Sequence, residues 1–418
     1  MSMSSTKLSH HGHQATTHRR NEGGPAWLSA AAGLCASLVG LGLARFAYTP
    51  LIPALIAAKW FSPADAVYLG AANLAGYLAG ALVARELGAR AGAVRTLRGM
   101  MALASLCCFA CSVPVSFSWF FAWRFLAGMT GGVIMVLAAS TILPHTAPSK
   151  RGLVGGVIFA GVGLGVAASG TFVPLLLQQG LRQSWYGLGL LSAFLTLVSW
   201  KAWPTEVPVK EHTPDSHAPS HGRPFTIVRV LKAEYGLNAL ALVPHMVFLV
   251  DFVARGLGQG ISAGSHYWVL YGIGATVGPL LTGHLADRAG FGPALRVAFL
   301  IETIAILLPA ISSAPAVMIV SSVIVGGFTP GIVPLVLGRI HELLPHSSSS
   351  QRAAWAQATT MFALFQAAGA YGLSYLFERT GGNYTVLFVI GASAVAASLA
   401  MDLITALTIG RDRKPSGA

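Results

Sequence analysis

Residues 117–143 read FSWFFAWRFLAGMTGGVIMVLAASTIL, and this stretch of 27 residues contains a single charged side chain, Arg124. A helix needs about 20 mostly apolar residues to cross a hydrocarbon core that is about 30 Å thick. The alternating pattern of a strand is absent, and backbone polar groups in lipid must be satisfied within their own segment. The stretch therefore predicts a membrane-spanning helix.

The same pattern recurs along the whole chain. Of its 418 residues, 54% are hydrophobic and only 10% are charged, whereas soluble domains have roughly 25% charged residues. This composition excludes an ordinary cytosolic enzyme, a disordered tail protein and a disulfide-rich secreted domain. The fold class that we predict is an all-α membrane protein with 12 transmembrane helices, at 27–58, 65–84, 97–115, 117–143, 152–177, 185–203, 236–257, 265–286, 294–313, 315–341, 353–377 and 384–408.

The basic residues predict how these spans are threaded. If the N-terminus is cytosolic, the inner segments hold 21 of the 27 lysines and arginines, the outer segments hold four, and Arg45 and Arg124 lie within spans. Such a bias is what the positive-inside rule predicts for an even number of spans. We therefore expect a multi-pass protein of the inner (plasma) membrane with both termini in the cytoplasm. The net charge of +13 requires no nucleic-acid partner.

One long polar connection divides the chain into two halves. Residues 204–234 are rich in proline, histidine and charge, which is typical of a flexible linker. The predicted domains are a cytosolic tail at 1–26, a six-helix bundle at 27–203, the linker at 204–234, a second bundle at 235–408 and a tail at 409–418. The halves echo each other, since Leu-Pro-His closes both the fourth and the tenth span. Repeated halves are a recurrent design of secondary transporters.

Two motifs carry a resemblance to the major facilitator superfamily. Residues 283–290 read GHLADRAG after the eighth span, and residues 124–128 read RFLAG in the fourth. The likeness covers the whole chain, and residues 42–53, GLARFAYTPLIP, are similar to the start of the YbfB/YjiJ branch. The resemblance implies two pseudo-symmetric six-helix bundles that work by alternating access. It also implies a central cavity lined by helices one, four, seven and ten.

The motif at 283–290 is expected to form a conformational latch. Gly283 and Gly290 would let the helix end and the loop approach closely, while Asp287 and Arg288 would form charged contacts at the cytosolic mouth. By resemblance, such contacts hold the inner side shut when the outer side is open. The alternative is a solvated loop with ordinary inner-leaflet charge.

Three charged residues inside the spans are candidates for a functional role, because a charge at the bilayer centre costs from about 3 to more than 10 kcal/mol. Counting residues places Arg45, Arg124 and Asp251 in the outer half of the bundle. Arg45 and Asp251 occupy symmetry-related helices, so we expect them to face each other as an outer gate, with Asp251 as the proton-sensitive member. The competing interpretation is an i,i+4 pair between Asp251 and Arg255 on one helix face.

Other polar residues in the spans have two interpretations each. Arg45 and Arg124 together would pair with an anionic organic solute such as a carboxylate, unless Arg124 is structural and bonded to backbone carbonyls. His245 is a candidate proton relay, since imidazole titrates near neutral pH, or else a hydrogen-bonded packing residue. Tyr48 is a candidate polar contact in the cavity. Glu302, in a peripheral helix, is interpreted as a packed, partnered or protonated carboxyl.

The function that we expect is secondary active transport of a small organic solute, driven by protons. No GxxxxGK[ST] loop occurs, so no ATP site is expected. No cofactor and no metal are expected either, and the expected partners are the solute, protons and the lipid bilayer around a monomer. The alternatives are an uncoupled facilitator of the same fold and a membrane-embedded enzyme or sensor. Uptake into proteoliposomes with and without a pH gradient would distinguish them.

Overall fold

Every element of the structure, a computed structural model, is helical. It describes residues 26–146, 151–204, 223–345 and 348–411, and these ranges contain no strand. The elements of the first half are α1 (Ala26–Ser37), the π-helix η1 (Leu38–Phe46), α2 (Tyr48–Ala57), α3 (Pro63–Ala91), α4 (Ala93–Ala110), α5 (Phe117–Ile142), the 3-10 turn η2 (Leu143–His145), α6 (Arg151–Leu177) and α7 (Leu181–Ser199). Those of the second half are α8 (Arg223–Ala241), the π-helix η4 (Pro244–Phe248), α9 (Leu249–Asp251), the π-helix η5 (Phe252–Gly256), α10 (Gly260–Ala289), α11 (Phe291–Ile311), α12 (Pro315–Leu343), α13 (Ser348–Arg379) and α14 (Tyr384–Arg411).

Among the described residues, ten helical segments are long and apolar enough to cross a membrane. Two predicted spans fall outside these ten: the one at 185–203, in α7, and the one at 353–377, in α13. Polar side chains explain why α13 is less apolar, since it carries Gln351, Gln357 and Gln366. The all-helical class is confirmed, and the number of twelve crossings stays a prediction.

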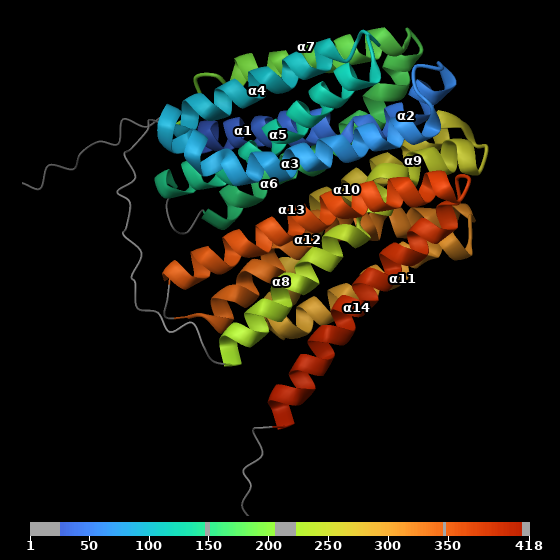
Figure 1. Cartoon of the computed structure of the whole chain (residues 1–418). Coiled ribbons are helices and arrows are strands. Elements are labelled where there is room, and N and C mark those ends of the chain that lie inside the picture. Colours follow the sequence, from blue (N-terminus) through green and yellow to red (C-terminus); the bar gives the residue numbers. More distant parts are fainter. Residues whose placement is uncertain (1–25, 147–150, 205–222, 346–347, 412–418) are drawn as a thin grey trace, which may run out of the picture.

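The helices form two groups that diverge toward one side (Figure 1). Residues 26 and 411 lie at this side, which we call the terminal side. The connections 58–62, 111–116, 178–180, 257–259, 312–314 and 380–383 lie at the opposite side, which we call the loop side. Equivalent helices pack in the same way in each half, α3 against α5 and α10 against α12. The halves meet where α6 packs against α10 and α3 against α13.

Glycines allow the equivalent helix pairs to approach closely. A Cβ atom on Gly76 of α3 would lie 1.9 Å from the carbonyl oxygen of Phe125 on α5. A Cβ atom on Gly278 of α10 would lie 2.0 Å from the carbonyl oxygen of Gly327 on α12. Both distances are shorter than any allowed contact, so only glycine fits at these positions. Glycines thus allow the same close packing of helices in both halves.

The substitution Gly278→Ala is expected to destabilise the fold, because α10 and α12 must move apart to fit the methyl group. Overpacking of this kind typically costs about 1–3 kcal/mol. Gly99→Ala is the matched control, since nothing lies within 4 Å of its Cβ position. In a helix interior that change stabilises by about 0.5–1 kcal/mol. Thermal unfolding of the purified variants in detergent measures both, and equal midpoints would contradict the packing argument.

The predicted linker at 204–234 ends earlier than expected, because α8 already begins at Arg223. Pro224 fits the first turn of a helix, and the apolar residues that follow it supply a face for packing. The first turns of α8 have a linker-like composition, and the sequence therefore predicts a linker there. The remaining part of that prediction, at 205–222, lies outside the described residues, as do most of the two predicted tails.

Candidate functional site

Arg45 connects the two halves at the loop side. Its Nη2 donates a hydrogen bond of 2.6 Å to Oε1 of Gln366 on α13. The guanidinium group lies 4.8 Å from the ring centre of Tyr77 and 5.1 Å from that of Phe46. Only 8% of the residue is exposed. The charge is therefore held by one amide oxygen and two aromatic faces.

Arg124 makes its contacts with residues of the first half. Its Nη1 donates to the backbone oxygen of Ala44 over 2.8 Å, and its guanidinium lies 4.2 Å from the ring centre of Tyr48. Asn73 of α3 in turn donates to the backbone oxygen of Arg124 over 3.0 Å. The hydroxyl group of Tyr48 is also committed, since it donates to the backbone oxygen of Ala66. These contacts fit the interpretation of Arg124 as a structural residue.

The space between Arg45 and Arg124 is small in this conformation. The cavity that both residues line has a volume of about 20 Å³. A single water molecule needs roughly 10–15 Å³ of such space. The two arginines therefore enclose room for about one water molecule and none for a carboxylate solute.

π-Helical turns mark equivalent positions in the two halves. The carbonyl of Ala44 belongs to η1, and the carbonyl of Met246 belongs to η4. A side chain from another helix bonds each of them: Arg124 bonds the first, and Thr49 donates to the second over 2.6 Å. Such wide turns are frequent at functional sites of helical proteins. The bond from Thr49 also joins the halves, because α2 belongs to the first and η4 to the second.

Asp251 pairs with its own helix rather than with the other half. Its carboxylate accepts bonds of 2.5 and 2.7 Å from Arg255 and one of 2.6 Å from the hydroxyl group of Tyr384. The i,i+4 interpretation is thus the one that this structure realises. The expected pair between Arg45 and Asp251 is not formed here, because Gln366 holds the arginine and Arg255 holds the carboxylate.

His245 is fully buried and has the contacts of a packing residue. Its Nε2 lies 2.8 Å from Oγ of Ser321, whose own proton is donated to the backbone oxygen of Ala305. The serine can therefore only accept, so Nε2 carries the proton. Nδ1 has no partner among the described residues, and the ring contacts Phe388 edge-on at 5.2 Å. A neutral imidazole satisfies these contacts.

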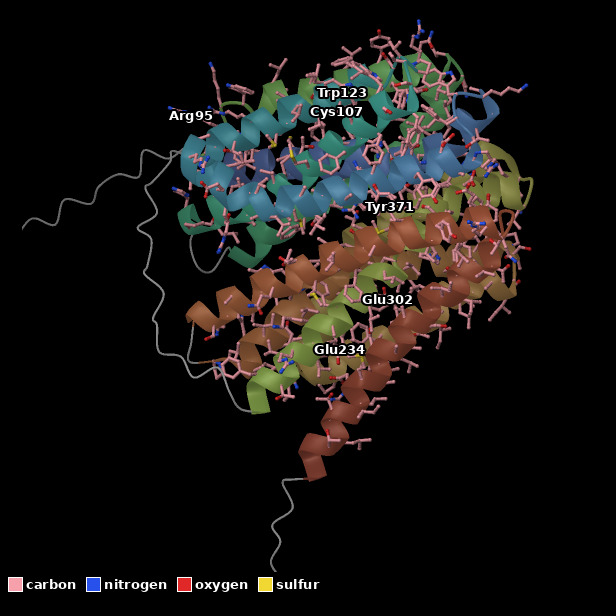
Figure 2. The ribbon with its side chains drawn as sticks, viewed as in Figure 1. Arg95, Cys107, Trp123, Glu234, Glu302 and Tyr371 are labelled. Carbon is pink, nitrogen blue, oxygen red and sulfur yellow. The ribbon has the colours of Figure 1, made fainter. Side chains whose placement is uncertain are left out.

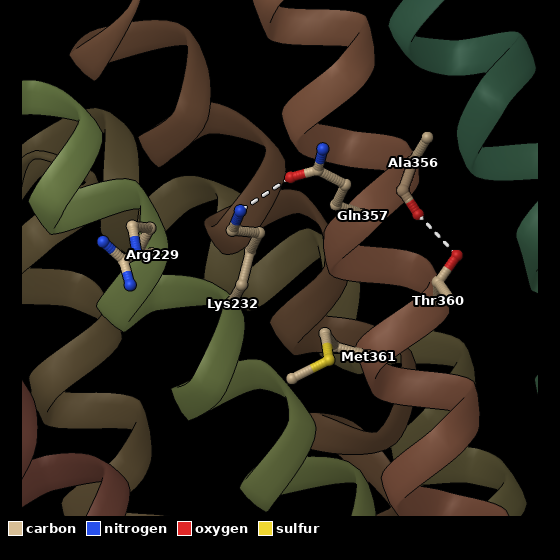
Figure 3. A pocket seen from close by; sticks show the side chains of 6 residues that line it. All are labelled: Arg229, Lys232, Ala356, Gln357, Thr360 and Met361. Atoms are coloured by element: carbon tan, nitrogen blue, oxygen red, sulfur yellow. Dashed lines mark hydrogen bonds between the residues drawn. The ribbon is translucent and has the colours of Figure 1, made fainter. Parts of the chain in front are cut away.

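A larger pocket lies between α8 and α13 toward the terminal side (Figure 3). Its volume is about 460 Å³, and it is lined by Arg229, Lys232, Ala356, Gln357, Thr360 and Met361. Nζ of Lys232 donates a bond of 2.7 Å to Oε1 of Gln357. Among the described residues, the lining contains two cations and no acidic side chain, so the pocket suits a negatively charged group.

The comparison with known families agrees with this architecture. A family model described as "Uncharacterised MFS-type transporter YbfB" matches residues 37–402. The chain belongs to this family. It is therefore a multi-pass membrane protein of the major facilitator superfamily, and the resemblance noted in the sequence is confirmed. No curated protein sequence matches the chain.

The loop motif of this MFS-type transporter differs from the expectation in one respect. Nothing lies within 4 Å of a Cβ position on Gly283, so this glycine allows no close approach. Gly290 has a φ of +81°, a conformation that favours glycine and that ends α10. Asp287 and Arg288 are exposed and have no polar partner among the described residues. The proposed latch is therefore not engaged in this conformation.

One short sequence in the second half matches a catalytic motif. Residues 260–264 read GISAG, which matches the nucleophile motif GxSxG. That motif works at a sharp turn from a strand into a helix, where the serine is exposed above a sheet. Here Ser262 lies in the first turn of α10, and the described residues contain no strand. Ser262 therefore does not occupy the strand-to-helix turn on which that motif depends.

Sequence reasoning missed the basic pocket. It placed Arg229 and Lys232 in the linker, whereas both lie on α8. A signal was present, because the two cations stand three residues apart, which puts them on one face of a helix. Their partners on α13 lie more than 120 residues away, and no local pattern indicates them.

Proposed function

We propose that this transporter carries a small organic anion across the plasma membrane by alternating access, coupled to protons. The observation that carries the proposal is the unequal contact between the halves. Hydrogen bonds join them toward the loop side, and a basic pocket lies toward the terminal side. Such a structure corresponds to one end state of a rocking bundle.

The contacts between the halves support this reading. The hydrogen bonds between the halves that involve described residues are Arg45 to Gln366, Thr49 to Met246, Tyr68 to Glu378 and Trp268 to Ser169. Each of these residues lies in the part of its helix nearer the loop side. Phe46 and Trp268 add an aromatic contact with ring centres 6.0 Å apart. The loop side is therefore the closed side in this conformation.

The chemistry of the pocket supports an anionic solute. A guanidinium group offers five N–H donors, and an ammonium group offers three, of which Lys232 gives one to Gln357. Arginine in particular binds a carboxylate through two parallel bonds. The volume of about 460 Å³ lies within the range of small-molecule sites, roughly 300–1,000 Å³.

The topology that we propose has twelve crossings with the terminal side in the cytoplasm. The excess of lysine and arginine in the connections on that side supports it, because basic loops stay on the cytoplasmic side. Arg95, in the first turn of α4, adds to the basic charge on that side (Figure 2). Under this topology the basic pocket faces the cytoplasm in the present conformation. A monomer without cofactor, metal or nucleic acid is part of the same proposal, as is the absence of catalysis.

Uptake of labelled mono- and dicarboxylates into proteoliposomes tests the proposal. With an imposed pH gradient we expect accumulation of one of these anions above its external concentration, and without the gradient only exchange. Equilibration without accumulation would favour the uncoupled facilitator. Failure of every anion, together with transport of a neutral or cationic solute, would contradict the assignment of the substrate class.

A further inference from the structure

Glu302 of α11 is fully buried inside the second half and does not line the basic pocket (Figure 2). Nδ2 of Asn238 on α8 donates a hydrogen bond of 2.6 Å to its Oε2. Its other oxygen, Oε1, has no partner among the described residues, and neither does Oδ1 of Asn238. Two buried oxygen atoms in one side-chain pair are thus left without a donor.

A proton on Oε1 of Glu302 would give both of these atoms a partner. Oε1 of an ionised carboxylate and Oδ1 of an amide are both acceptors, so they cannot bond to each other. If Glu302 is protonated, its O–H becomes a donor for Oδ1, while Nδ2 continues to donate to Oε2. The acid and the amide then form a closed pair with two hydrogen bonds. Without the proton, a full charge lies in the bundle with a single donor, which is unfavourable in an apolar interior.

Among the described residues, no unpaired cation lies near Glu302 to offset an ionised carboxylate. Arg296, six residues before it on α11, pairs with Asp402 of α14, and Arg339 of α12 pairs with Glu342. The remaining titratable groups that neighbouring helices direct toward this region are Glu234 on α8, His245 on η4 and Tyr271 on α10. These three are acidic or neutral, so they favour the neutral acid.

We propose that Glu302 is the proton-binding site of this transporter, protonated in the present conformation and deprotonated when α8 moves away from α11. The proposal rests on the proposed function, in which the halves rearrange during transport. Movement of α8 would remove Asn238 and admit water to the carboxyl group, and both changes favour release of the proton. The proton then leaves to that water.

The same helix connects this proton site to the basic pocket. Asn238 follows Lys232 by six residues on α8, which is about 9 Å along the helix. An anion in the pocket would draw Lys232 toward α13, and a protonated Glu302 holds Asn238 near α11. Both effects therefore act on one rigid helix, α8. That element continues into the π-helices η4 and η5, where wide turns allow it to bend. Solute and proton thus bias the position of a single helix.

The variant Glu302→Gln tests the protonation directly. A glutamine side chain reproduces the neutral acid, since its amide can accept from Nδ2 of Asn238 and donate to Oδ1, so the variant is expected to fold. In infrared spectra of the purified protein, the wild type is expected to show a protonated carboxyl band at neutral pH that Glu302→Gln loses. The control Glu86→Gln, at an exposed residue paired with Arg90, should retain the band. Identical spectra of the wild type and Glu302→Gln would overturn the proposal.

A transport measurement tests the coupling. In proteoliposomes, Glu302→Gln is expected to lose accumulation driven by a pH gradient and to keep exchange of solute across the membrane. Asp251→Asn is the competing variant, because Asp251 is the other candidate for the proton-sensitive group. Loss of accumulation in Asp251→Asn alone would overturn the assignment to Glu302. If the wild type transports no tested anion, the proposed function fails, while the infrared band still decides whether Glu302 is protonated.

Discussion

A transporter in which glutamine replaces both Arg229 and Lys232 is expected to bind an anionic solute at least about 100-fold more weakly than the wild type. A hydrogen bond to a charged group contributes about 1.5–3 kcal/mol, and about 1.4 kcal/mol corresponds to a factor of ten. Two such contacts are lost in the variant. The fold should persist, because Arg229 is exposed and Lys232 only partly buried. Titration of carboxylates against tryptophan fluorescence measures the affinity.

The control for this experiment separates the pocket from general electrostatic attraction. Arg95 is an exposed cation on α4, on the same side of the membrane but outside the pocket. Arg95→Gln should therefore bind the anion as the wild type does. Screening by salt weakens long-range attraction much more than paired contacts. If the double variant and Arg95→Gln bind the anion equally well, the anion binds outside this pocket.

The variant Gln366→Ala is expected to open the loop side. It removes the only side-chain acceptor that Arg45 has among the described residues, and only 8% of Arg45 is exposed. A hydrogen bond to a charged group contributes about 1.5–3 kcal/mol, and the contacts of Arg45 with the rings of Tyr77 and Phe46 remain in the variant. The closed conformation loses that free energy and the open one does not. The population of the closed conformation should therefore fall by about one to two orders of magnitude.

Labelling of a cysteine measures this opening. Ile52 is fully buried on α2 and lines the small cavity beside Arg45, so Ile52→Cys reports access from the loop side. In the Gln366→Ala background the thiol should react faster with a membrane-impermeant reagent. Gln366→Glu should slow the reaction, because it gives Arg45 a charged partner. Equal rates in both backgrounds would show that this contact does not hold the loop side closed.

The positions of most helices could be predicted from composition, because lipid imposes a strong constraint on the backbone. A segment without water must satisfy its own hydrogen bonds, so a long apolar window is a helix. The predicted span at 117–143 corresponds to α5 within one residue. The start of α8 could not be predicted in the same way. Its first turns carry Arg229 and Lys232, which face a pocket rather than lipid and so resemble a linker.

The candidate site was predictable in its residues but not in its partners. Arg45 and Arg124 stand out in the sequence because charge is rare within spans. The acceptor of Arg45 is Gln366, 321 residues away, and no local pattern in the sequence pairs these two residues. The pair between Asp251 and Arg255 was visible because helical spacing is local. Asn238 and Glu302 meet only because α8 and α11 both pack against α14 and α12.

The wide turns in η1 and η4 have a consequence for how this chain tolerates changes of length. One residue more or less in a helix rotates everything beyond it by about 100°. A π-helical turn holds about one residue more than an α-helical turn, so it can take up an extra residue without rotating the helix that follows. A one-residue deletion within η1 that restored ordinary helical winding should therefore leave α2 facing nearly the same way and keep Thr49 near Met246. Single-residue deletions should be accepted more readily in η1 and η4 than in the regular helices on either side.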